Sequence, residues 1–176
     1  DTVALMLANR PEFSLADTAV MHLGATAFSV YNTSSAEQAN HLFRNAGNRI
    51  VVTERQFLAR VLESRTPEIE HIVLVDGAEA GTMPLQDVAR LRTPGFDFDA
   101  AWRAVQPDDV VTLIYTSGTT GPSKAVQLTH GSVLFQTRGV AEILGLQADG
   151  RSISYLPSAH VGDRCLTHYG ASLCFG

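Results

Sequence analysis

Residues 110–124 read VVTLIYTSGTTGPSK, an apolar run followed directly by a polar loop, with four hydroxyl residues and two glycines at positions 116–121 and a lysine at position 124. The apolar part, Val110–Ile114, is typical of a buried strand. The polar part is longer than a surface turn requires. Glycines let backbone N–H groups converge on an anion, hydroxyl groups donate further hydrogen bonds, and Lys124 adds a positive charge. The stretch therefore predicts a strand that ends in a loop able to hold a polyphosphate.

The candidate nucleotide-binding residues of this loop are Thr116, Ser117, Gly118, Thr119, Thr120, Gly121 and Lys124. Their spacing differs from the P-loop signature, in which a glycine directly precedes the lysine, because two residues separate Gly121 from Lys124. A P-loop NTPase is therefore disfavoured. A solvated turn between two strands is the alternative interpretation, but such a turn does not need four hydroxyl groups and a terminal lysine.

Short apolar runs alternate with helix-like segments along the rest of the chain, which is the pattern of βαβ units. The expected fold class is therefore α/β, with mostly parallel sheets flanked by helices. The predicted strands are Val3–Leu7, Ala25–Val30, Ile50–Thr53, His71–Val75, Val110–Tyr115, Ala125–Leu128 and Ser152–Leu156. The predicted helices run from Pro11 to Gly24, from a capping box at Ser34 or Ser35 to about Ala46, and from Glu54 to Ser64.

The stretch 76–107 is rich in glycine and proline, and only its segments Leu85–Leu91 and Asp99–Val105 have a helical pattern. It is expected to be a connector, with a boundary between two sub-sheets inside it.

Composition places the chain among soluble globular proteins. With 176 residues, 45% apolar and 18% charged, one domain could bury roughly 70% of the surface of its unfolded chain. The formal charge of −5 is dispersed, so a nucleic-acid partner is not expected. The run Ala19–Val30 is too short for a transmembrane helix. Two cysteines, Cys165 and Cys174, are too few for a disulfide framework, which favours a cytoplasmic location, with peripheral membrane contact as a further option.

A resemblance to a known family follows from the loop. The segment YTSGTTGPSKAVQLTH, positions 115–130, resembles the signature of the adenylate-forming (AMP-binding) superfamily. Four further segments resemble, in the same order, the amino-terminal half of a long-chain fatty acid–CoA ligase: VALMLANRPEF, HLGATAFSVYNTSSAEQ, PDDVVTLIY and YLPSAHVGDR. Three residues depart from the family pattern, namely Ser123, Ala125 and Ser158.

The resemblance implies that a fatty acid and ATP form an acyl-adenylate, whose acyl group then passes to coenzyme A, with Mg²⁺ accompanying ATP. It implies that Thr116–Gly121 wrap the β- and γ-phosphates and that Lys124 neutralises charge on the departing pyrophosphate. His160 matches a histidine beside the acyl and adenylate pocket. Lys124 and His160 are thus the candidate catalytic residues, and a long-chain fatty acid is the candidate substrate.

Several alternatives stay open. The later motifs of such a ligase are not found in residues 1–176, so the chain is expected to be a partial AMP-binding domain. It could instead be a non-catalytic remnant, either a weak nucleotide-binding module or a partner that joins another ligase chain through open sheet edges. A structural role for His160 is the alternative to a pocket role. The cluster His160, Asp163, Cys165 and His168 suggests a metal site, but no ligand pair in it has a recognised spacing, and a pairing of Arg164 with Asp163 or a neighbouring carboxylate is the simpler interpretation.

Overall fold

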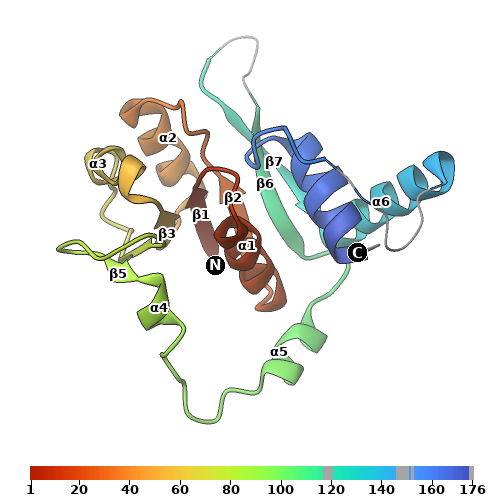
Figure 1. Ribbon diagram of the computed structural model, residues 1–176, viewed down its shortest axis with the longest axis horizontal. Helices are drawn as coiled ribbons and strands as arrows, with labels where there is room; N and C mark the ends of the chain where they lie inside the picture. Colours follow the sequence, from red (N-terminus) through yellow and green to blue (C-terminus); the bar gives the residue numbers. More distant parts are fainter. Residues whose placement is uncertain (117–120, 146–150, 152, 175–176) are drawn as a thin grey trace.

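The computed structural model describes residues 1–116, 121–145, 151 and 153–174. Its core is one seven-stranded sheet in the order β5-β4-β3-β1-β2-β6-β7 (Figure 1). The strands are β1 (Thr2–Met6), β2 (Thr26–Ser29), β3 (Ile50–Thr53), β4 (His71–Leu74), β5 (Met83–Pro84), β6 (Val110–Thr116) and β7 (Lys124–Thr129). Every pairing is parallel except that of β6 with β7. The predicted α/β class with a mostly parallel sheet is confirmed.

Helices connect the strands and flank the sheet. They are α1 (Pro11–His22), α2 (Ala36–Ala46), α3 (Arg55–Glu63), α4 (Leu85–Val88), α5 (Phe98–Ala104), α6 (His130–Leu144) and the π-helix η1 (Asp163–Cys174). The three long helices predicted from the sequence are confirmed. The capping box of α2 forms between Ser35 and Gln38, and Gly47 ends this helix in the left-handed region, at a φ of 60°.

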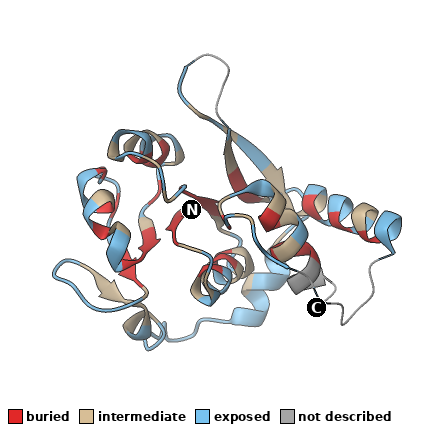
Figure 2. Ribbon diagram, turned by 45° about the horizontal axis from the view of Figure 1, so that its top comes forward, coloured by how far each residue is buried: buried red, intermediate tan, exposed pale blue. Residues whose placement is uncertain are grey.

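Helices cover both faces of the sheet, and the side chains of β1 pack alternately against the two helix layers. Successive side chains of a strand point to opposite faces. Val3 and Leu5 pack on the face covered by α1, whereas Ala4 and Met6 pack on the face covered by α2 and α3. In Figure 2 much of the central strands is red, the colour of buried residues. Because β1 is buried on both faces, its sequence reads as a continuous apolar run.

The connector 76–107 contains β5, α4 and α5 and leads the chain from β4 to β6. After α4 it runs along the lower edge of the view in Figure 1. The expected boundary between two sub-sheets is not seen among the described residues, since the strands before and after the connector belong to one sheet. β6 pairs with β2 in the register Ala27↔Thr112, and the Thr26 hydroxyl donates to the carbonyl of Val110 at 2.8 Å. This pairing satisfies a strand edge of β2 that would otherwise be open.

The sequence was misleading in the carboxyl-terminal third. The strand predicted at Ser152–Leu156 is wrong for its described part, because residues 153–156 form no strand. Their polar groups bond elsewhere: the Ser154 hydroxyl donates to Asp163, and the Leu156 carbonyl accepts from the side chain of Asn9.

Helix α6 was not predicted, although it carries its own signals. Thr129 and Ser132 form a capping box, and Gly145 ends the helix in the left-handed region, at a φ of 61°. α6 packs beside η1, where Val111, Val133 and Tyr169 form a small buried cluster.

Candidate functional site

The two ends of the polar loop are held together by an antiparallel pairing. Thr116 is the last residue of β6 and Lys124 the first residue of β7, and the two are direct partners in the register. Both side chains are exposed. Gly121 has a φ of 98°, which favours glycine over any other residue. The candidates Ser117, Gly118, Thr119 and Thr120 lie outside the described residues. The structure thus brings Thr116 and Lys124 together at the base of one hairpin, with Gly121 in the loop that joins them.

Helix α2 supports this base from one side. His41 Nε2 donates to the carbonyl oxygen of Ser123 at 2.9 Å, which holds the residue just before Lys124. At the other end of the loop, the Tyr115 hydroxyl donates to Asn45 Oδ1 at 2.9 Å. Burial raises the pKa of Tyr115 to about 12, so this hydroxyl keeps its proton at neutral pH. The backbone of Ser123, one of the residues that depart from the pattern of the resembling family, is thus held by α2.

A cavity of about 640 Å³ is lined by α2, by the β6–β7 hairpin, and by Thr2 and Thr26 at the amino ends of β1 and β2. Its lining includes His41, Asn45, Ser123, Lys124 and Gln127. These side chains offer hydrogen-bond donors, acceptors and one ammonium group. The arrangement can hold a polar or anionic group beside Lys124.

His160 lies in the turn that leads into η1, and its side chain is exposed. Its Nδ1 accepts a hydrogen bond from the backbone N–H of Gly162 at 3.0 Å. A neutral ring with an accepting Nδ1 carries its proton on Nε2. His160 therefore presents an Nε2–H donor at the surface.

The start of the polar loop and the His160 turn both lie at the carboxyl ends of the parallel strands. Asn9, three residues after β1, is bonded to Leu156 and Ser158, so the turn lies at the carboxyl end of β1. The polar loop begins at the carboxyl end of β6. β1, β2 and β6 are parallel neighbours, and adjacent strands lie about 4.8 Å apart. The two strand ends are therefore about 10 Å apart. No hydrogen bond or ion pair between described residues joins Lys124 to His160.

A buried ionic cluster fixes the start of η1. Arg164 is bonded to Asp17 of α1, and the two side chains are 0% and 1% exposed. The expected partner Asp163 instead accepts from Ser154 at 2.7 Å. Burial would raise the pKa of Asp17, but the charge of Arg164 and the nearby His168 outweigh it and hold this pKa below its ordinary value.

The structure brings no metal cluster together within the part of the chain that it describes: no group of three His, Cys, Asp or Glu side chains is placed to hold an ion. Asp163 is bonded to Ser154, and His168 faces Asp17 at 3.1 Å. The same described residues contain no helix with the length and apolar character needed to cross a membrane.

Sequence reasoning missed the residues that support the site, namely Asn9, Asp17, His41 and Asn45. Each is polar and lies in or just beside an element whose apolar pattern was recognised. A polar residue shortly after a buried strand, such as Asn9, was the only available signal, because side chains at strand ends gather at one edge of a parallel sheet.

Comparisons with known proteins identify the family and the fold of the chain. The family model described as AMP-binding enzyme matches residues 1–175. A Mycobacterium tuberculosis protein provisionally named fatty-acid–CoA ligase fadD11 is 52% identical over 85 residues, which cover 48% of this chain and 15% of that protein. The long-chain-fatty-acid–CoA ligase FadD15 of Mycobacterium bovis is 28% identical over 172 residues, 95% of this chain and 29% of its own.

Among solved structures, ATP-bound MatB from Rhodopseudomonas palustris superposes with a TM-score of 0.81 at 20% identity, over 97% of this chain and 33% of that one. This likeness concerns the fold. The chain spans about a third or less of the length of each of these relatives.

Proposed function

Because the chain belongs to the AMP-binding enzyme family, we propose that it is the amino-terminal part of an adenylate-forming fatty acid–CoA ligase. In this reaction a fatty acid carboxylate attacks the α-phosphorus of ATP, and the bond to pyrophosphate breaks. The thiol of coenzyme A then takes the acyl group from the acyl-adenylate, and AMP leaves. The observation that carries the proposal is the register pair Thr116↔Lys124, which closes the hydroxyl- and glycine-rich loop at the end of β6.

The proposed role of the loop follows from where charge develops. Negative charge grows on the pyrophosphate as it departs, so donors and cations placed there lower the barrier most. Hydroxyl and backbone N–H groups of 116–121 would bind the β- and γ-phosphates. Lys124, held by the pairing and by the His41–Ser123 bond, would place its ammonium group beside them.

His160 is proposed to orient the acid. Its Nε2–H can donate to a carboxylate oxygen or to the acyl-adenylate carbonyl, because Nδ1 is already occupied by Gly162. The names of relatives such as FadD15 support a fatty acid, and a long chain is the substrate class proposed here.

ATP and coenzyme A are substrates of the proposed reaction, and Mg²⁺ would supply further charge neutralisation of the phosphates. The described residues offer no cluster of metal-ligating side chains, so no protein ligand is assigned to the ion. A cytoplasmic location with peripheral membrane contact stays a prediction from the sequence.

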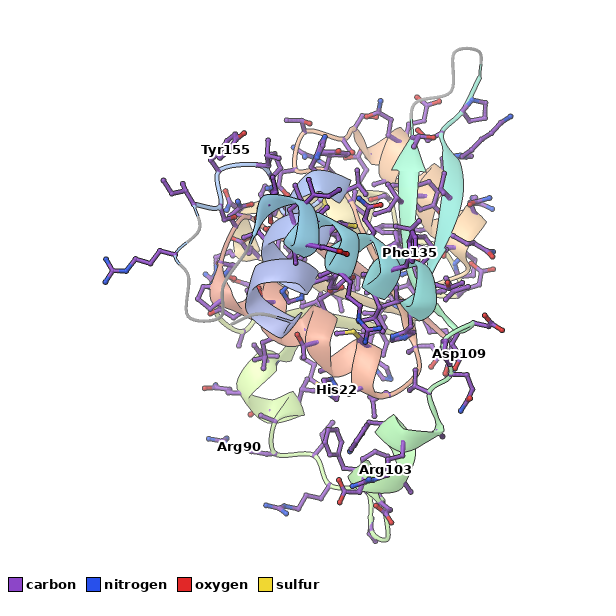
Figure 3. The ribbon with its side chains drawn as sticks, turned by 90° about the vertical axis from the view of Figure 1, so that its right-hand side faces the viewer. His22, Arg90, Arg103, Asp109, Phe135 and Tyr155 are labelled. Carbon is purple, nitrogen blue, oxygen red and sulfur yellow. The ribbon has the colours of Figure 1, made fainter. Side chains whose placement is uncertain are left out.

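The decisive experiment is acid-dependent ATP–pyrophosphate exchange with a palmitate-like acid. Lys124→Ala is expected to reduce exchange by at least about a hundredfold, the range for removal of one charge-stabilising group. Arg90→Ala is the matched control, because Arg90 is an exposed cation on the connector, at the bottom of Figure 3. Equal activity of Lys124→Ala and the parent chain would contradict the proposal.

A chemical test needs no turnover. Lys124 is the only lysine in the 176 residues, so an amine-directed reagent can modify one side chain and the terminal amine. Peptide mapping separates the two. ATP is expected to slow modification of Lys124 and to leave the terminal amine unaffected. Modification at an unchanged rate would show that ATP does not reach this loop.

A second candidate is association with another chain that completes the fold. β7 is the last strand of the sheet order and pairs only with β6 among the described residues. Val126 on this strand is 44% exposed, and Phe135 on α6 is 81% exposed (Figure 3). Open strand edges beside apolar side chains favour association. Co-sedimentation with a second ligase chain measures this association, and separate sedimentation of the two chains over a wide concentration range would contradict it.

A further inference from the structure

We propose that Asn9 is a positioning residue for His160, an inference that rests on the proposed ligase function. Its side-chain amide makes three hydrogen bonds to the segment before His160. Nδ2 donates to the carbonyl oxygen of Leu156 at 2.7 Å. Oδ1 accepts from the backbone N–H of Ser158 at 2.8 Å and from its hydroxyl at 3.0 Å. One side chain thus fixes the backbone two and four residues before His160.

The segment is also held after His160. The backbone N–H of Arg164 donates to the carbonyl of His160 at 3.1 Å, and the Arg164 side chain is locked in the buried pair with Asp17. The imidazole itself accepts from Gly162. The backbone is thus anchored on both sides of His160, and the Gly162 bond orients the exposed ring.

The contacts of Asn9 need a side chain that both donates and accepts, as an amide does. Leu156 presents an acceptor and Ser158 presents donors, so the partner must donate on one side and accept on the other. Aspartate would place an acceptor against the Leu156 carbonyl. Ser158 is buried, at 8% exposed, and a polar residue is accommodated here because its hydroxyl donates to Asn9. A larger apolar residue at 158 would remove one donor from Asn9.

The anchoring has a consequence for the reaction geometry. Asn9 extends from the carboxyl end of β1, and the phosphate-binding loop begins at the carboxyl end of β6, two strands away. Since a sheet is rigid, this attachment fixes the position of His160 relative to Lys124. A misplacement of about 1 Å is enough to lower catalysis substantially.

The first test reads the ring of His160 directly and does not depend on activity. ¹⁵N shifts of the imidazole, assigned with His160→Asn, are expected to show an Nε2–H tautomer in the parent chain. In Asn9→Ala they are expected to move toward a tautomer average. Asn40→Ala is the control, because Asn40 also donates to a distant carbonyl, that of Ser64, at 3.0 Å. It is expected to leave the His160 shifts unchanged.

The second test uses exchange kinetics. Asn9→Ala is expected to raise the KM for the acid or lower the exchange rate about tenfold, the effect of losing one or two net hydrogen bonds. The KM for ATP and the protection of Lys124 by ATP are expected to stay within about twofold. Ser158→Ala, a milder change, should cost about threefold in the parent chain and nothing further in the Asn9→Ala background, because the bond it removes is already lost.

The outcomes separate this inference from the proposed function. His160 shifts that are identical in the parent, Asn9→Ala and Ser158→Ala chains would overturn the positioning role, whatever the activity. A changed His160 signal in chains that show no acid-dependent exchange would retain the positioning role and reject the ligase function. An equal rise in the KM values for ATP and acid would point to a general structural effect and overturn the inference.

Discussion

Asp17 and Arg164 form a fully buried ion pair although 147 positions separate them in the sequence. Asp17 lies on α1 and Arg164 near the start of η1. Arg164 also donates to the hydroxyls of Ser29 at 3.1 Å and Tyr169 at 2.7 Å. These contacts satisfy most of the guanidinium donors, which a buried charge requires. The pair therefore ties the segment that carries His160 to the first helix and to β2.

Asp17→Ala should destabilise the chain by about 3–5 kcal/mol, since it leaves the Arg164 charge buried without its partner. The free energy of unfolding in urea measures this change. Asp87→Ala is the control, because Asp87 pairs with Arg90 at an exposed site, where an ion pair contributes little. Similar effects of the two substitutions would mean that the buried pair does not hold the fold.

The same pair makes stability sensitive to acid. The folded-state pKa of Asp17 is lowered, so this carboxylate stabilises the chain above its unfolded pKa of about 4 and loses that contribution as the pH falls through the lower folded value. Urea midpoints of the parent chain are expected to fall below about pH 4. Asp17→Asn should be less stable at neutral pH and show a flatter profile in this range. Parallel profiles would contradict the assignment to Asp17.

Gly162→Ala is expected to lower acid-dependent exchange without weakening ATP protection of Lys124. A Cβ at 162 would lie 3.0 Å from Nδ1 of His160 and 3.3 Å from Cδ1 of Leu156, so the ring must move. Gly139→Ala on α6 is the control: nothing lies within 4 Å of its new Cβ, and alanine should stabilise the helix by about 1 kcal/mol. Unchanged exchange by Gly162→Ala would show that this ring position is not required.

His41→Ala should weaken ATP binding at the loop about fivefold, because it removes the hydrogen bond to the Ser123 carbonyl next to Lys124. The ATP concentration that half-protects Lys124 from modification measures the effect. His71→Ala is the control, since His71 is an exposed residue on β4, away from the hairpin. Equal protection in the His41 variant and the parent would exclude α2 as a support of the loop.

The sequence by itself determined those features that depend on neighbours along the chain. Apolar runs marked six of the seven strands, and local signals such as the Ser35–Gln38 capping box and the glycine at 47 marked the ends of helices. The polar loop after β6 was found because its glycines, hydroxyls and lysine lie within ten residues. Helix α6 shows the limit of this approach: its capping box at Thr129 and terminal Gly145 were present but not recognised.

Only the tertiary structure decided which distant side chains meet. The order β3-β1-β2-β6 places the carboxyl ends of β1 and β6 at one edge, which brings Asn9 to Ser158 and the His160 turn near the loop of Lys124. The same fold packs α1 against η1, so that Asp17 pairs with Arg164. Such pairs join residues about 150 positions apart, and no local pattern can encode them. Their contacts depend on which strand edges pair and which faces are buried, and that choice is made by the packing of the whole sheet.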